Sequence, residues 1–96
     1  MIAVTALLKA KRGEEAQLER ILRELAQKVR GAEPGCLLYQ VARSQHDRQL
    51  YAVIERYTDE EALAAHANSE HNRDATPALM ECLEERPEIS LFEELE

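Results

Sequence analysis

The sequence lacks any long run of apolar residues, and nothing at its start resembles a signal peptide. Met1-Ile2-Ala3-Val4 leads directly into an alternating segment without a cleavage site. A membrane-spanning helix needs about 20 mostly apolar residues, so we expect neither a membrane span nor secretion. These absences predict a cytoplasmic protein. The composition, with 45% hydrophobic and 32% charged residues, is typical of a soluble globular domain.

Cysteine and basic residues are also scarce. The two cysteines, Cys36 and Cys82, lie far apart in apolar surroundings, so reduced and buried thiols are the simplest interpretation, with a disulfide as the alternative. Residues 49–96 contain three Lys/Arg against thirteen Asp/Glu, whereas residues 1–48 contain nine against six. Because phosphate binding needs a basic surface, this acidic half argues against nucleic acid as a partner.

The first half of the chain alternates between strand and helix patterns. Residues 2–9 are apolar at both odd and even positions, which predicts a strand buried on both faces and ended by Gly13. Apolar residues at helical spacing then predict a helix from Glu14 to Gly31, with Leu18, Ile21, Leu22, Leu25 and Val29 in one stripe. Glu33-Pro34-Gly35 predicts a turn with positive φ at the glycine.

The alternation over 36–43 and 50–57 predicts an antiparallel hairpin. Thr58-Asp59-Glu60-Glu61 has the form of a capping box, so a helix should begin at Thr58 and continue to about Ala67. Ser69 resembles a second N-cap. Pro77 should kink the following helix or restart it with Thr76 as the cap, and a last strand should follow Pro87.

This order of elements predicts an α+β fold of the ferredoxin-like β-α-β-β-α-β type, with helices on one face of a four-stranded antiparallel sheet. We expect a single domain over residues 1–96, without internal repeats. The other face of the sheet has too many apolar residues to lie bare, so a second copy of the chain should cover it.

The residues in this order resemble the antibiotic biosynthesis monooxygenase (ABM) superfamily, and in particular its small quinol-monooxygenase-like members. The resemblance is carried by Pro34-Gly35-Cys36, Tyr39, Glu55-Arg56-Tyr57, Asp59-Glu60-Glu61-Ala62-Leu63, His66, Ser69-Glu70-His71 and Pro87-Glu88-Ile89. It implies a dimeric α+β barrel, formed by two sheets packed face to face. It also implies a cofactor-independent monooxygenase that oxidises quinol- or anthrone-type aromatic substrates with O₂ and needs neither metal nor flavin.

The chain departs from the family pattern in places. Tyr57 stands where many members have tryptophan, and Asn72 follows His71 where many have phenylalanine. The haem-degrading branch uses an Asn/Trp/His set, but His66 and Thr76 stand at the Trp and His positions and the first strand has no asparagine. Haem degradation is therefore disfavoured, because the fold alone does not establish it.

His66 and His71 are the candidate catalytic residues, since histidine is the usual base near neutral pH. Five residues apart, they do not share a face of one helix, and only a break near Asn68-Ser69 would let them converge. A helix-end role for His66 and a surface position for His71 are the alternatives. No His-x₃-His pair or acidic partner at helix spacing accompanies them, so we expect no metal site.

Five further residues are candidates for binding the substrate: Tyr57, Asn72, Glu55, Arg73 and Tyr39. Glu55 could instead pair with Arg43 across the hairpin, and the tyrosines could simply pack. The expected partners are a small aromatic substrate, O₂ and a second copy of the chain. The alternative to an oxygenase is a non-catalytic dimeric barrel that binds a small molecule or has only a structural role.

Overall fold

The four predicted strands form one antiparallel sheet in the order β2-β3-β1-β4, and β1 and β3 occupy its centre. The computed structural model describes residues 1–96 and has the ferredoxin-like order that the sequence predicts, with the second helix divided in two. The elements are β1 (Ile2–Lys9), α1 (Glu15–Ala32), β2 (Cys36–Arg43), β3 (Leu50–Tyr57), α2 (Glu60–Ala67), α3 (Glu70–Glu81) and β4 (Glu88–Glu93).

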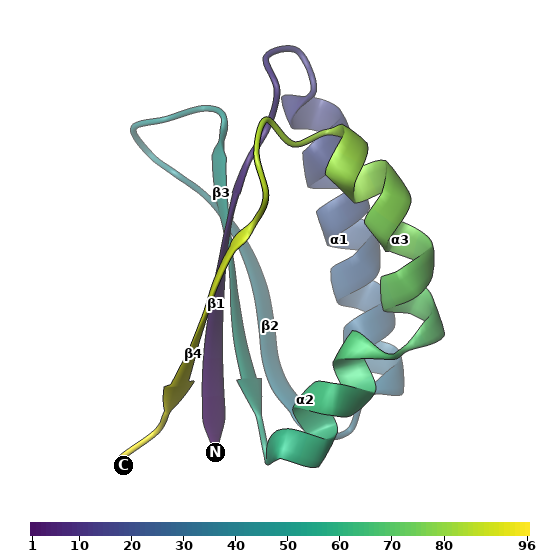
Figure 1. The fold of residues 1–96 in the computed structure, drawn as a ribbon, viewed down its shortest axis with the longest axis vertical. Coiled ribbons are helices and arrows are strands. Elements are labelled where there is room, and N and C mark those ends of the chain that lie inside the picture. The colour runs from purple at the N-terminus through teal and green to yellow at the C-terminus, as the bar shows by residue number, and fades with distance from the viewer.

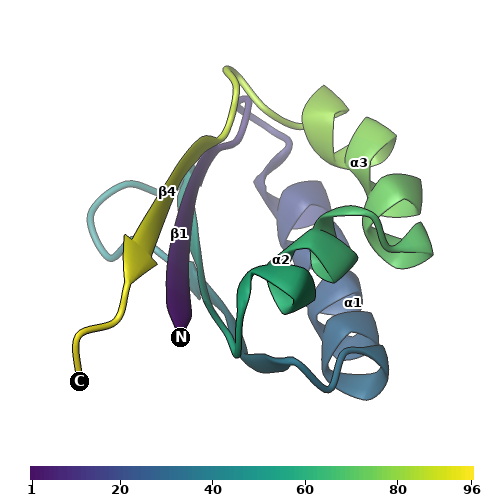
Figure 2. The ribbon, with the colours of Figure 1, turned by 60° about the horizontal axis from the view of Figure 1, so that its bottom comes forward.

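All three helices lie on one face of the sheet (Figure 1), and the view from below shows α2 next to the end of β3 (Figure 2). The core fills the space between α1 and the sheet. It includes the predicted apolar stripe of α1, of which Leu18 and Val29 are completely buried, and the alternate residues Ala6 and Leu8 of β1. None of the helices is long and apolar enough to cross a membrane.

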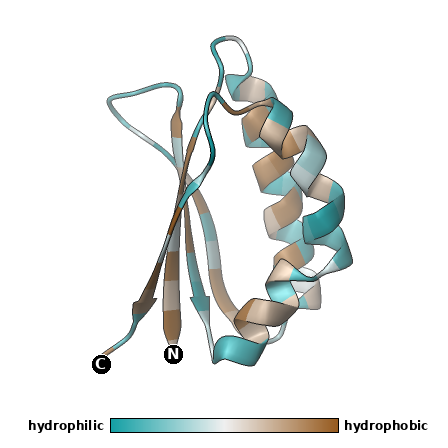
Figure 3. Cartoon of the chain, viewed as in Figure 1, coloured by the Kyte–Doolittle hydropathy of each residue, from teal (hydrophilic) through white to brown (hydrophobic).

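The prediction that β1 is buried on both faces is wrong for the single chain. Val4, Ala6 and Leu8 face the helices and are buried, whereas Leu7 on the opposite face is 39% exposed. Directly paired residues of neighbouring strands share a face of the sheet, so the register places four large apolar residues on this uncovered face: Leu7, Leu38, Ile54 and Phe92. Hydrophobic colour recurs along the strands in Figure 3.

The two glycines near the end of α1 behave differently from the prediction. Helix α1 continues through Gly31 to Ala32. Positive φ occurs at Gly13 and not at Gly35, so the predicted turn conformation at Gly35 is wrong. Gly35 is required for a steric reason, because a Cβ atom there would lie 2.6 Å from the Cβ of Ala62 in α2. Its carbonyl oxygen accepts a hydrogen bond from the Thr58 N–H at 2.9 Å, which closes this corner of the fold.

The helix caps are close to the predicted positions, with one shift. Asp59, not Thr58, caps α2, and its Oδ1 accepts a hydrogen bond from the Ala62 N–H at 2.8 Å. The Ser69 hydroxyl caps α3 as predicted. Helix α3 runs without a restart through Pro77, and the Thr76 hydroxyl donates to the Asn72 carbonyl at 2.7 Å instead of capping a new helix.

Candidate functional site

A cluster of one carboxylate and two imidazoles lies where the end of α1 meets α2 and α3. The Glu33 carboxylate is 3.0 Å (Oε2) and 3.1 Å (Oε1) from Nδ1 of His66. Its Oε2 also contacts Nε2 of His71. The side chains of Glu33 and His66 are each 10% exposed and that of His71 is 16% exposed. One buried carboxylate therefore joins both candidate histidines.

The break between α2 and α3 brings the two histidines together. Helix α2 ends at Ala67, Asn68 caps it with its N–H bonded to Ala64, and Ser69 begins α3. The two histidines lie on either side of this break, and their imidazole centroids are 6.5 Å apart. The convergence that depended on a break near Asn68-Ser69 is thus present.

Two tyrosines and a second carboxylate surround the His66 ring on the sheet side. The ring centroids of Tyr39 and Tyr57 lie 5.4 Å and 5.6 Å from that of His66, in tilted orientations. Tyr39 and Glu55 are register partners on β2 and β3, and the Tyr57 hydroxyl donates to Oε1 of Glu55 at 2.6 Å. Glu55 is only 6% exposed, and Tyr57 is completely buried.

Burial controls the protonation of this second carboxylate and its neighbours. Burial raises the pKa of Glu55, although the hydrogen bond from Tyr57 and the charge of His66 act in the opposite direction. Burial, followed by the nearby Glu55 charge, raises the pKa values of Tyr39 and Tyr57 as well. Both phenols therefore remain protonated at neutral pH. Burial and the Glu33 charge raise the pKa of the Cys36 thiol, which disfavours a reactive thiolate.

The raised pKa of Glu55 predicts a pH-dependent stability difference between the wild type and Glu55→Gln. A carboxyl group with a higher pKa in the folded state binds more protons folded than unfolded, so its stabilising contribution is lost as the pH rises. Glutamine does not titrate. We expect the free energy of unfolding of the wild type, relative to Glu55→Gln, to decrease from about pH 4 to about pH 8 in urea titrations. An increase over this range would mean that the Tyr57 hydrogen bond outweighs burial.

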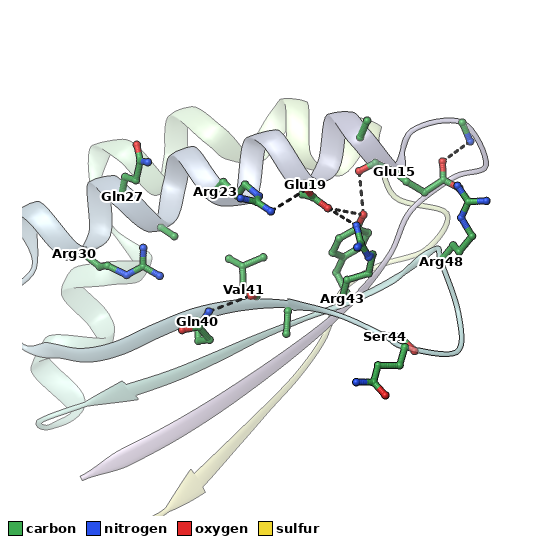
Figure 4. A pocket seen from close by; sticks show the side chains of 16 residues that line it. Glu15, Glu19, Arg23, Gln27, Arg30, Gln40, Val41, Arg43, Ser44 and Arg48 are labelled. Carbon is green, nitrogen blue, oxygen red and sulfur yellow. Dashed lines mark hydrogen bonds and ion pairs between the residues drawn. The ribbon is translucent and has the colours of Figure 1, made fainter.

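Two cavities border helix α1, and one of them reaches His71. A groove of about 1130 Å³ runs between α1 and β2 and is lined mainly by polar side chains, including Glu19, Arg23 and Arg43. Figure 4 shows that Glu19 is held there between the two arginines. None of the residues proposed from the sequence for catalysis or substrate binding lines this groove. A smaller cavity of about 240 Å³ between α1 and α3 is lined by His71.

Comparison with known proteins shows the family of the chain. The family model of antibiotic biosynthesis monooxygenases matches residues 1–78. The chain belongs to this family. A candidate antibiotic biosynthesis monooxygenase from Caulobacter crescentus has 34% identity and a TM-score of 0.95, with 99% of this chain and 90% of that chain covered. A protein from Pseudomonas aeruginosa has 33% identity, a TM-score of 0.90 and coverages of 99% and 94%.

A candidate antibiotic biosynthesis monooxygenase from Deinococcus radiodurans is also similar, with 27% identity, a TM-score of 0.90 and coverages of 100% and 94%. No curated protein matches the chain. The family that the sequence resemblance implied and the ferredoxin-like fold of the single chain are thereby confirmed.

Two further residues predicted to bind the substrate, Asn72 and Arg73, lie in the first turn of α3. Asn72 is half-buried in the first turn of α3, and its side chain amide donates to the Ala67 carbonyl at 3.4 Å. Arg73 is exposed on the same turn. The alternative pairing of Glu55 with Arg43 is wrong, because Arg43 is opposite Tyr51 in the register and binds Glu19 at 2.9 Å.

Sequence reasoning missed Glu33 as a site residue. In the sequence Glu33 belongs to a turn pattern. In the structure Glu33 is the acidic partner of both histidines. Its proximity depends on the packing of the α1 end against α2 and α3, and the two histidines follow it by 33 and 38 residues. The only sequence signal that could have pointed to Glu33 as a site residue is its position next to Pro34-Gly35.

Proposed function

We propose that the protein is a cofactor-independent monooxygenase that oxidises quinol- or anthrone-type aromatic substrates with O₂, and that His66 is the base. The observation that carries this proposal is the hydrogen bond between Nδ1 of His66 and the buried Glu33 carboxylate. A carboxylate that accepts from Nδ1–H selects the tautomer whose Nε2 is an unprotonated acceptor. The only hydrogen bonds of the His66 ring are those to Glu33, so Nε2 remains free to accept a substrate proton.

The proposed reaction requires little of the protein beyond deprotonation, orientation and shielding. Removing a phenolic proton makes the ring electron-rich enough to pass an electron to O₂. The substrate supplies all four electrons, one oxygen atom enters the ring or the anthrone carbon, and the other leaves as water. Tyr39 and Tyr57 pack against the base and, as neutral phenols, leave it as the proton acceptor. His71 supports the Glu33 carboxylate from the other side.

An uncovered apolar strip on the helix-facing side of the edge strand β4 is suited to an aromatic ring. Val4 is the register partner of both Glu55 on β3 and Leu91 on β4, so Leu91 lies on the helix-facing side of the sheet, and Ile89 shares that side through Ala6. The helices do not cover this strip, since Ile89 is 60% and Leu91 58% exposed. We propose that the substrate lies over β4 with its hydroxyl toward His66, and that Asn72 and Arg73 bind its polar edge.

An oxygen-uptake assay tests the proposed function. Protein freed of metal ions and flavin should consume O₂ with quinols of the menadiol type faster than these compounds autoxidise, and the oxidised product should accumulate. A rate equal to autoxidation across quinols and anthrones would overturn the proposal. It would favour the non-catalytic barrel, in which the hydrogen bonds to Glu33 are purely structural.

We also propose that two copies of the chain form a homodimer through the uncovered face of the sheet. Leu7, Leu38, Ile54 and Phe92 form an apolar surface there, with exposed fractions between 36% and 54%. Burying this surface against a second copy would stabilise the dimer by a free energy of about 25 cal/mol per Å² of apolar area removed from water. The acidic tail stays at the rim, where Glu94 forms a double hydrogen bond with Arg56.

A charge at the centre of this face should dissociate the dimer. Ile54 is paired with Thr5 on one side and Gln40 on the other, so Ile54→Glu places a carboxylate in the middle of the sheet. We expect the wild type to sediment as a dimer and Ile54→Glu as a monomer, because an unpaired charge in an apolar interface is costly. Gln17→Glu on the exposed side of α1 is the matched control and should remain dimeric. A monomeric wild type would exclude the interface.

A further inference from the structure

The three polar side chains of the cluster are also arranged as a set of metal ligands. Each offers one donor atom: a carboxylate oxygen of Glu33, Nδ1 of His66 and Nε2 of His71. All three atoms lie within 4.8 Å of one another. The ligands of one tetrahedral Zn²⁺ ion, at bond lengths of about 2.0–2.2 Å, lie about 3.4 Å apart. Small side-chain rotations would therefore bring the three atoms to coordination distance.

We propose that Glu33, His66 and His71 bind one divalent transition-metal ion of the Zn²⁺ class. Two imidazole nitrogens and one carboxylate are a donor set that favours such ions. Mg²⁺ and Ca²⁺ prefer sites made of oxygen ligands alone. The three residues come from the end of α1, the last turn of α2 and the first turn of α3, so defined helix ends hold them. All three side chains are largely buried and none pairs with a lysine or arginine.

The surroundings of the cluster fit a bound ion. The rings of Tyr39 and Tyr57 hold the His66 imidazole in its present orientation from the sheet side. His71 lines the cavity of about 240 Å³ between α1 and α3, and its side chain is 16% exposed, so solvent reaches this ligand. Three protein ligands and one water are the usual composition of an open zinc site.

Metal binding and base chemistry are mutually exclusive at His66. The ion takes the place of the proton that Nδ1 shares with Glu33, and the neutral ring then carries its proton on Nε2. Nε2 is the atom that the proposed oxygenase reaction needs as an acceptor. The metal-bound form therefore has no free base at this position. Binding itself is measured without a substrate, so it stands or fails independently of the proposed monooxygenase activity.

Titration calorimetry with Zn²⁺ tests the proposal. The metal-free wild type should bind one Zn²⁺ per chain at micromolar protein concentration, and Co²⁺ in its place should give the visible absorption bands of a four-coordinate site. Glu33→Gln and His71→Asn should each weaken Zn²⁺ binding by at least about 100-fold, more than the loss of an outer-shell partner. His46→Ala, which removes the exposed histidine of the β2–β3 loop, is the matched control and should bind as the wild type does.

Three results would overturn the proposal. They are no binding to the wild type, equal affinity in the two cluster variants, and a binding site lost in Cys36→Ser but kept in Glu33→Gln. Urea titrations of the metal-free variants show whether each one folds. His71→Asn changes the most exposed of the three ligands and keeps the proposal testable if Glu33→Gln does not fold.

Discussion

Replacing His66 with alanine is expected to lower kcat/KM for quinol oxidation by about 10²–10⁴, the usual contribution of a positioned base. His66 is the cluster residue with one ring nitrogen held by Glu33 and the other without a hydrogen-bond partner. The loss should appear in kcat, because deprotonation belongs to the chemical step. A substrate with a more acidic hydroxyl should lose less rate, since it needs the base less. The measurement is steady-state O₂ uptake, corrected for autoxidation.

Two variants make this result specific. His46→Ala removes an exposed histidine of the β2–β3 loop and should leave the rate unchanged. His71→Ala should cost only about 10–100-fold, because His71 acts by supporting the carboxylate that orients His66. If His66→Ala keeps the wild-type rate while the wild type is active, the assignment of the base is wrong. A larger loss in His71→Ala than in His66→Ala would exchange the two roles.

Replacing Gly35 with alanine is expected to destabilise the fold by about 1–3 kcal/mol, the typical cost of overpacking. The added Cβ would lie 2.6 Å from the Cβ of Ala62, an atom that is fixed to the helix backbone and cannot rotate away. Helix α2 would have to move away from β2, and His66 lies one turn further along that helix. Urea unfolding measures the loss of stability, and O₂ uptake shows whether displacement of α2 also lowers activity.

Gly31 is the matched control for Gly35. It lies inside α1 without positive φ, and a Cβ there would meet nothing within 4 Å. Gly31→Ala should therefore stabilise the protein by about 0.5–1 kcal/mol, because alanine loses less backbone entropy on forming a helix. If both alanine variants were equally stable, the close approach of α2 to Gly35 would not be a constraint on this fold.

Most of the fold could be predicted because its signals are local. The alternation of β2 and β3, the stripe of α1 and the cap at Ser69 each depend on residues within a few positions of one another. The errors lie where a distant element decides the local structure. Gly35 matches a turn pattern with positive φ, but the structure requires a glycine there because Ala62 of α2 leaves no room for a Cβ. Similarly, β1 is apolar on both faces, while a single chain covers only one of them.

The sequence indicates which histidines form the candidate site, but not all of the hydrogen bonds that join its residues. His66 and His71 stand out as imidazoles on either side of a helix break, and the break itself has a readable cap at Ser69. Glu33 has no such signal, because it reaches the histidines only through the tertiary packing of three helix ends. Glu55 was predicted as a site residue, but its bond to Tyr57, two residues on and on the same face of β3, was not recognised.

The central position of β1 also has a consequence for how the chain folds. β1 is the first strand to be synthesised, yet its two neighbours are β3 and β4, and Ile2 pairs with Tyr57 and with Glu93. Folding must therefore close two long loops before the sheet is complete, which predicts slow folding for a domain of this size. On the ribosome, the apolar β1 strand has no partner until β3 has emerged, and its second edge stays open until β4 follows. A chain stalled between them exposes a paired β1 with one bare edge, a species prone to aggregate.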